Sequence, residues 1–198
     1  MREYYLLYPT TMNPCTLERR FYEEARKAWL CPGCGSPRCH IQGLEVLIQE
    51  DKPDNAALNG ITGTSLGLAK KNCITRFGDK ILSKYFELGK VYGPNGVMLE
   101  EWVVFVGKHQ VIVRGTEHVK LRQCPACGRN IYFGVGQRYL YPAPPQDVLV
   151  MDGSNGLLVV ADELLPPLEL CTWPKVKCVK LPVLDVPLDG LVDLKSVY

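Results

Sequence analysis

Two short cysteine motifs constrain this chain more than any other feature. Residues 31–35 read Cys-Pro-Gly-Cys-Gly and residues 124–128 read Cys-Pro-Ala-Cys-Gly, with 89 residues between Cys34 and Cys124. In each motif the two intervening residues let both sulfurs point at one ion, and the proline begins a turn. The trailing glycine permits a left-handed backbone that aims N–H groups at the sulfurs. Two such pairs supply four thiolates, the complete ligand set of a closed tetrahedral zinc site, which would join distant parts of the chain.

We therefore predict one structural zinc ion. A catalytic zinc keeps an open coordination position and recruits histidine or carboxylate ligands, whereas four thiolates close the shell and weaken the metal as a Lewis acid. Cys39 and His40, five and six residues past Cys34, are the main alternative ligands, and the sequence leaves open whether either replaces one of the four. The predicted ligands are Cys31, Cys34, Cys124 and Cys127.

The first motif is also similar to a dithiol redox site, because residues 29–34 read Trp-Leu-Cys-Pro-Gly-Cys. Redox chemistry of that kind needs the first cysteine at a helix N-terminus, where the helix dipole lowers the pKa of the thiol. Here the residues that follow the motif, Gly35, Ser36 and Pro37, are poor helix sequence, and the expected helix precedes it. We therefore exclude dithiol redox as the main function.

Composition and cysteine usage limit the class of protein. A chain of 198 residues with 46% hydrophobic and 22% charged residues can bury a sizeable core, and a net charge of +2 gives no electrostatic case for a nucleic acid or a membrane surface. Nine cysteines, without a signal peptide or an apolar run of about 20 residues, argue for a reducing cytosol. We expect a soluble cytoplasmic protein. Cysteines outside the predicted site are expected to be buried thiols: Cys15, Cys73, Cys171 and Cys178.

Hydrophobic periodicity predicts an α+β fold with a mixed or antiparallel sheet and two main helices. The helices are expected over residues 16–30, which lead into the first motif, and 79–88, which Gly89 closes. The second motif is expected at the tip of a β-hairpin, as in zinc ribbons. Strands are expected over 2–8, 43–49, 101–106, 109–114, 117–123, 130–136, 147–151, 157–160 and 175–181.

This pattern predicts a single α+β domain over residues 1–198. A zinc-knuckle module is expected from about 29–40 together with 117–136. Prolines become frequent after residue 140, so residues 142–198 are a candidate C-terminal subdomain within that single domain.

Other motifs give no catalytic constellation, so we expect no enzymatic activity. The glycines of residues 60–67, followed by Lys70 and Lys71, fail the spacing of a phosphate-binding loop and indicate a flexible loop. Aromatic residues cluster after the second motif with arginines between them, an array that some zinc ribbons use to bind nucleic acid. Alternating aromatics on a hairpin are more often a core face, and the low net charge lends nucleic-acid binding no support. The cluster contains Arg129, Tyr132, Phe133, Arg138, Tyr139 and Tyr141.

The order of helix, first motif, long spacer, second motif on a hairpin and closing α+β segment resembles the myxobacterial double-CxxCG paralogous family. The resemblance covers most of the chain, from the N-terminal strand through residues 157–160. Its specific anchors are Cys31, Cys34, Gly35, Cys124, Cys127 and Gly128.

The resemblance implies a cytoplasmic immunity protein of the SitI type. Such proteins protect kin cells against lipoprotein toxins passed between neighbours by outer-membrane exchange. Each would bind and block the C-terminal effector domain of its cognate toxin without doing chemistry itself. The resemblance gives no residue-level map of the toxin-binding surface. The alternative is a zinc-ribbon nucleic-acid-binding or regulatory protein, which salt-dependent binding to DNA or RNA would distinguish.

Overall fold

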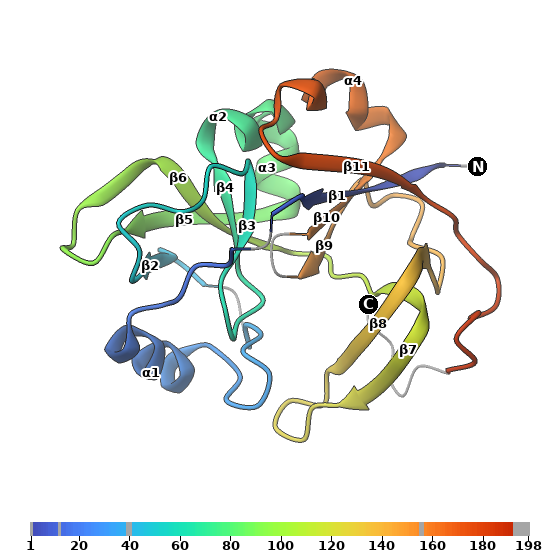
Figure 1. Cartoon of the computed structure of the whole chain (residues 1–198), viewed down its shortest axis with the longest axis horizontal. Helices are drawn as coiled ribbons and strands as arrows, with labels where there is room; N and C mark the ends of the chain where they lie inside the picture. Colours follow the sequence, from blue (N-terminus) through green and yellow to red (C-terminus); the bar gives the residue numbers. More distant parts are fainter. Residues whose placement is uncertain (1, 12, 39–40, 155–156, 192–198) are drawn as a thin grey trace.

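The computed structural model describes residues 2–11, 13–38, 41–154 and 157–191, and its fold is α+β (Figure 1). The strands are β1 (Tyr4–Pro9), β2 (Glu45–Leu47), β3 (Leu58–Gly60), β4 (Gly67–Lys70), β5 (Phe86–Tyr92), β6 (Met98–Gly107), β7 (Val113–Gln123), β8 (Asn130–Leu140), β9 (Val150–Ser154), β10 (Leu157–Ala161) and β11 (Val176–Leu181). The α-helices are α1 (Arg19–Ala28), α2 (Lys71–Ile74), α3 (Asp79–Tyr85) and α4 (Leu165–Leu168). Single 3₁₀ turns cover Thr75–Phe77, Asp162–Leu164 and Leu170–Thr172.

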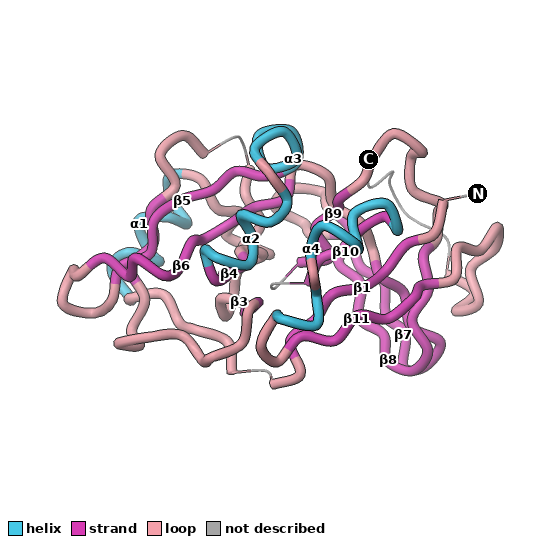
Figure 2. The backbone as a smooth tube through the Cα atoms, turned by 90° about the horizontal axis from the view of Figure 1, so that it is seen from above, coloured by secondary structure: helices cyan, strands magenta, loops and turns pink. Residues whose placement is uncertain are grey.

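Three sheets organise the described chain. A five-stranded sheet has the order β2-β5-β6-β4-β3 and is mixed, because β2 pairs with β5 in parallel and the other pairs are antiparallel. A four-stranded antiparallel sheet has the order β11-β1-β10-β9, so the N-terminal strand pairs with two strands from the C-terminal part of the chain. Strands β7 and β8 form a separate hairpin. Figure 2 shows the two larger sheets side by side, with α2, α3 and α4 along their junction.

The larger hydrophobic core lies between these two sheets. It contains Leu7 and Val159 from the four-stranded sheet and Phe105 from the five-stranded sheet, all with no exposed surface. Trp173, next to the last 3₁₀ turn, closes this core and is 3% exposed. Burial of side chains this large supplies the main stabilisation of both sheets.

The second core lies on the opposite face of the five-stranded sheet, under α1. Side chains alternate across a strand, so Trp102, Val104 and Val106 of β6 point to this side while Phe105 points to the larger core. Helix α1 covers them through half-buried side chains that include Phe21. The carboxylate of Glu18 accepts a hydrogen bond from the Phe21 N–H at 3.1 Å and caps the first turn. Helix α1 ends at Ala28, and the first cysteine motif begins three residues later at Cys31.

The expectation of two main helices is not exact, because the described chain contains four α-helices: α1 and α3 lie in the two expected regions, and α2 and α4 are single turns of four residues. The helix expected over residues 79–88 ends at Tyr85, and residues 86–92 form β5. A Cβ atom at Gly89 would lie 1.9 Å from the carbonyl oxygen of Leu44. Gly89 is therefore needed where the chain leading into β2 approaches β5, and it caps no helix.

The β7–β8 hairpin projects beside the four-stranded sheet, and its tip lies near the loop that follows α1 (Figure 1). Its register runs from Gln123 opposite Asn130 to Val113 opposite Leu140. This confirms the sequence prediction of a hairpin that carries the second motif. Residues 182–191, which we call the C-terminal strap, run back along the hairpin, where Leu140 N–H donates to the Pro182 carbonyl at 2.9 Å.

No helix in the described part of the chain is long and apolar enough to cross a membrane.

Candidate metal centre

The two cysteine motifs fold into the same knuckle. In the first, Cys31 N–H donates to the Ser36 carbonyl and Gly35 N–H donates to the Cys31 carbonyl, both at 2.8 Å. The second motif repeats both bonds at the equivalent positions, each at 2.7 Å. Gly35 and Gly128 have φ angles of 68° and 72°, the left-handed conformation that glycine adopts without steric cost. The repeated proline and glycine thus produce two matching turns from local chemistry alone.

The fold brings the four predicted ligands together. The Sγ atoms of Cys31 and Cys124 are 3.7 Å apart, those of Cys34 and Cys127 are 3.6 Å apart, and all four lie within 4.8 Å of one another. These separations exclude disulfides, whose sulfurs are about 2.05 Å apart. A tetrahedral site with metal–sulfur bonds of about 2.3 Å has sulfur–sulfur edges of about 3.8 Å, so the cluster has the size that one such ion requires.

The cluster is closed on one side and open on the other. Cys31 and Cys124 are each 1% exposed, Cys34 is half-buried and Cys127 is exposed. Two of the candidate ligands therefore lie inside the protein, where a thiolate needs hydrogen bonds or a compensating charge to be stable. The other two complete the site at the surface, which leaves a path for a metal ion to enter.

Electrostatics within the cluster also favour a cation. Burial opposes ionisation of Cys31, but backbone N–H groups of Gly33 and Cys34 donate to its sulfur and lower its pKa to about 6. Although the Cys127 residue is exposed, the atoms around its sulfur partly desolvate it, and hydrogen bonds with the neighbouring thiols add to this effect, so its pKa is raised to about 12. Cys31 thus ionises readily while Cys127 resists, because hydrogen bonds between the thiols favour the Cys31 thiolate and the neutral Cys127 thiol. A divalent cation at the centre would remove that conflict.

Contact between the knuckles depends on Gly33, the second residue inside the first motif. A Cβ atom at this position would lie 2.8 Å from the Sγ of Cys124 and 3.2 Å from the Cβ of Ala126. The second motif has alanine at the equivalent position, so only one of the two knuckles needs glycine there. Sequence reasoning missed this residue, because nothing within the first motif shows which knuckle the other approaches.

The glycine-rich segment of residues 60–67 packs against the first knuckle. It was expected to be a flexible loop, but it forms the ends and the turn of the β3–β4 hairpin. A Cβ atom at Gly35 would lie 2.0 Å from the carbonyl oxygen of Gly63, and the Tyr22 hydroxyl of α1 donates to that same oxygen at 3.3 Å. The first knuckle is therefore held between α1 and the β3–β4 turn.

The other cysteines separate into two groups. Cys15 and Cys73 are 2% and 3% exposed, as expected, and burial raises the pKa of both, that of Cys15 to about 12. Cys171 and Cys178 are exposed, so their expected burial is wrong. Cys178 lies on the edge strand β11, whose side chains from 177 to 180 face solvent. The alternative ligands Cys39 and His40 lie outside the described residues.

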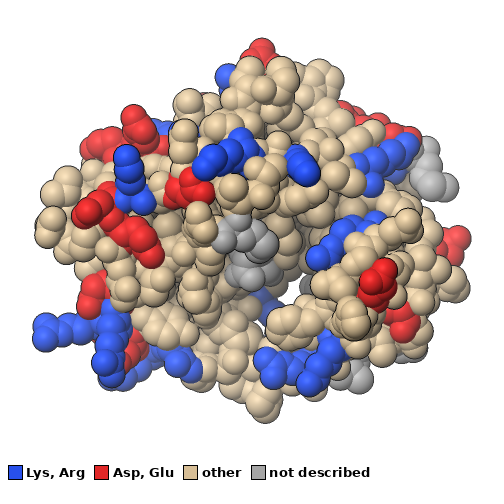
Figure 3. All heavy atoms as spheres, in the orientation of Figure 1, with Lys and Arg blue, Asp and Glu red and all other residues tan. Residues whose placement is uncertain are grey.

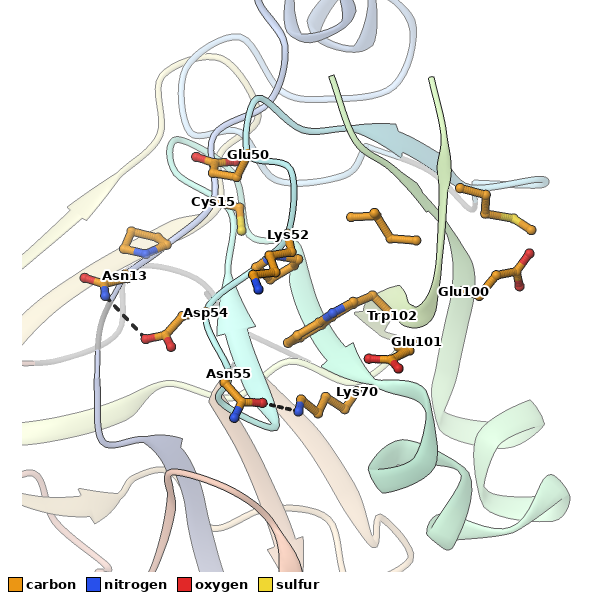
Figure 4. A pocket seen from close by; sticks show the side chains of 14 residues that line it. Asn13, Cys15, Glu50, Lys52, Asp54, Asn55, Lys70, Glu100, Glu101 and Trp102 are labelled. Carbon is orange, nitrogen blue, oxygen red and sulfur yellow. Dashed lines mark hydrogen bonds between the residues drawn. The ribbon is translucent and has the colours of Figure 1, made fainter. Parts of the chain in front are cut away.

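A separate groove of about 1080 Å³ lies between β6, β4 and the loop of residues 50–55 (Figure 4). Trp102 lines it, and the Lys70 ammonium lies 5.9 Å from the centre of the indole ring. Lys70 donates to the Asn55 side chain, and Asp54 accepts hydrogen bonds from Thr11 and Lys175 that lower its pKa. These charged groups hold the loop in place, and the groove is distinct from the metal centre.

Comparison of the chain with protein-family models finds no match, and comparison with curated proteins finds no match either.

Proposed function

We propose that the protein binds one structural zinc ion through Cys31, Cys34, Cys124 and Cys127. The donor chemistry supports zinc, because thiolates select soft or borderline metals and four of them at tetrahedral spacing are typical of structural zinc sites. When bound, the ion supplies a crosslink between the end of α1 and the tip of the β7–β8 hairpin. Cys31 and Cys124 would anchor it inside the protein, and Cys34 and Cys127 would close the shell.

Elemental analysis tests this assignment. Protein purified without added metal is expected to carry about one zinc per chain. A Cys31→Ser variant is expected to carry much less, whereas Cys171→Ser, which changes an exposed cysteine outside the cluster, keeps the full amount. Equal zinc in all three proteins would contradict the assignment.

We further propose that the protein acts as an immunity protein, a stoichiometric inhibitor that binds and neutralises the C-terminal domain of a cognate toxin delivered between kin bacterial cells. The observation that carries this proposal is the pair of matching knuckles, because these are the anchors of the resemblance to the double-CxxCG family. A closed four-thiolate shell favours a structural role for the metal, and hence a binding function over catalysis. The proposed site of action is the cytoplasm of the protected cell.

Co-expression with a candidate toxin gene, sought next to this gene, tests the function. Cells that express the toxin domain alone are expected to stop growing, and co-expression of this chain is expected to restore growth. The two proteins are also expected to copurify as a complex with one copy of each. If growth is not restored and no complex forms, the immunity proposal is wrong.

A further inference from the structure

The two faces of the β7–β8 hairpin have different environments. Side chains alternate across a strand, so Leu121 and its partner Tyr132 point to one side, while Lys120 and its partner Phe133 point to the other. The Tyr132 hydroxyl donates to a carboxylate oxygen of Asp189 at 2.9 Å. The first side is therefore covered by the C-terminal strap, to which Asp189 belongs.

The opposite side of the hairpin, which we call the outer face, has no such cover in the described structure. Phe133 and Val135 are 53% and 45% exposed, and Lys120 and Arg122 are also exposed. The Arg122 guanidinium lies 5.7 Å from the centre of the Phe133 ring, within the range of a cation–π contact. The outer face consists of Lys120, Arg122, Ile131, Phe133 and Val135.

The charge on the outer face is positive near the knuckle. Lys120 lies opposite Phe133 and Arg122 lies opposite Ile131, while Glu117 lies opposite Val135, farther from the second motif. Figure 3 shows blue side chains over the lower end of the hairpin. An exposed aromatic ring beside two cations is complementary to an apolar pocket that has carboxylates at its edge.

The hairpin is also fixed at both ends, which lowers the entropy cost of binding. At its tip, the cysteine cluster joins it to the first knuckle, and at its base Arg114 forms a buried ion pair with Asp189 of the strap. We propose that the outer face is the surface that docks onto the cognate toxin domain, with Phe133 entering an apolar pocket and Lys120 and Arg122 pairing with carboxylates around it. This inference rests on the proposed immunity function and assigns it a surface.

The same residues argue against a nucleic acid as the occupant. Binding to a single strand uses several aromatic rings on which successive bases stack. Of the four aromatic residues that cluster after the second motif, only Phe133 lies on the outer face. Tyr132 is bonded to Asp189, Tyr139 is 1% exposed, and the Tyr141 ring lies 5.0 Å from the Arg114 guanidinium. The aliphatic side chains of Ile131 and Val135 complete the face and suit a protein partner better.

Calorimetry with the zinc-loaded chain and the purified C-terminal domain of the adjacent toxin tests the surface. Phe133→Ser and Arg122→Glu are each expected to raise the dissociation constant by about 10- to 100-fold, the range of interface hot spots. Lys80→Glu, a charge reversal at an exposed position of α3, is the matched control and should leave it unchanged. Zinc content and melting temperature are measured for every variant, because both should equal those of the wild type.

The outcomes separate the surface from the function. If the wild type binds the toxin domain and the Phe133 and Arg122 variants bind it equally well, the outer face is not the docking surface, and the immunity function stands. If the wild type does not bind, the function and the surface both fail. A 12-nucleotide oligo-dT is the second probe. Salt-sensitive binding to it that the same variants abolish would identify a nucleic-acid surface and overturn the protein partner.

Discussion

Arg114 of β7 donates through Nη1 to both carboxylate oxygens of Asp189, at 2.8 and 3.0 Å, and neither side chain has any exposed surface. The two residues are 75 positions apart, so this ion pair ties the C-terminal strap to the base of the hairpin. The same guanidinium donates to the carbonyls of Leu191 and Tyr141. Bonds to several acceptors offset the cost of removing both charges from water.

Removal of the carboxylate should be strongly destabilising. Asp189→Ala leaves the Arg114 charge buried without its anion, which typically costs about 3–5 kcal/mol. For a chain of this size, the melting temperature should fall by roughly 6–20 °C in calorimetry. Asp185→Ala, in the same strap but at an exposed position, is the matched control and should change it little. Equal melting temperatures for the two variants would mean that the ion pair contributes nothing.

The contribution of Asp189 to the free energy of unfolding should depend on pH only below about pH 4. Burial raises the pKa of Asp189, but hydrogen bonds from Leu191, Tyr139 and Tyr132 and the Arg114 charge outweigh it and lower the pKa below its ordinary value. A carboxyl with a lowered pKa stabilises the fold fully above its unfolded pKa, about 3.9, and loses this effect as the pH falls through the folded value. The difference in melting temperature between wild type and Asp189→Asn should therefore stay constant from pH 8 to 5 and shrink below about pH 4. A difference that already shrinks between pH 7 and 5 would contradict the assigned direction.

Loss of a buried ligand should weaken the whole fold as well as the metal site. Cys124→Ser removes one of the two sulfurs that anchor the proposed zinc, so binding no longer stabilises the folded state fully. We expect a loss of at least about 2 kcal/mol, or roughly 5 °C in melting temperature. Cys171→Ser should match the wild type. An unchanged melting temperature for Cys124→Ser would show that the site does not stabilise the fold.

Gly33→Ala tests the contact between the knuckles without changing any ligand. The added Cβ would lie 2.8 Å from the Cys124 Sγ, so one knuckle must move and the cluster must distort. Overpacking of this kind costs about 1–3 kcal/mol, and competition with a chelator should show weaker metal binding by about tenfold or more. At Gly93 an added Cβ has no neighbour closer than 3.7 Å, so Gly93→Ala is the control. Equal affinities in the two variants would show that the knuckles do not meet closely at Gly33.

Metal removal should loosen the hairpin tip first. With a chelator present, hydrogen exchange should accelerate at Cys124 and Gly128, whose N–H groups make the knuckle bonds. Exchange in β1 and β10 should accelerate less, only as far as the fall in global stability requires, because their pairing and the core between the two sheets do not involve the cluster. Exchange measured by mass spectrometry checks both regions. An equal increase at the hairpin tip and in β1 and β10 would show that the metal does not restrain the tip beyond its effect on global stability.

Much of the metal centre could be predicted because its determinants are local. The spacing within each motif, the proline and the trailing glycine define a knuckle wherever they occur, so the ligand set and the left-handed glycines follow from ten residues of sequence. Alternation on both sides of the second motif likewise predicts a hairpin. The helix expected through Leu88 ends at Tyr85 for a nonlocal reason: Gly89 is required by the close approach of the Leu44 carbonyl to β5, and a glycine needed for that contact has the same appearance in the sequence as one that ends a helix.

The sequence by itself determined which four cysteines can share an ion and which turn each pair adopts, because those properties depend on residues within a few positions of one another. Only the tertiary structure decided that Gly33 lies against Cys124 and that Arg114 forms an ion pair with Asp189. It also decided that Tyr132 faces the strap while Phe133 faces solvent. Each of these contacts depends on how segments tens of residues apart pack together. A shift of the hairpin register by one residue, for example, would turn each of its side chains to the opposite face. The paired motifs therefore locate the proposed metal, whereas the packing around them produces the surface that the hairpin presents.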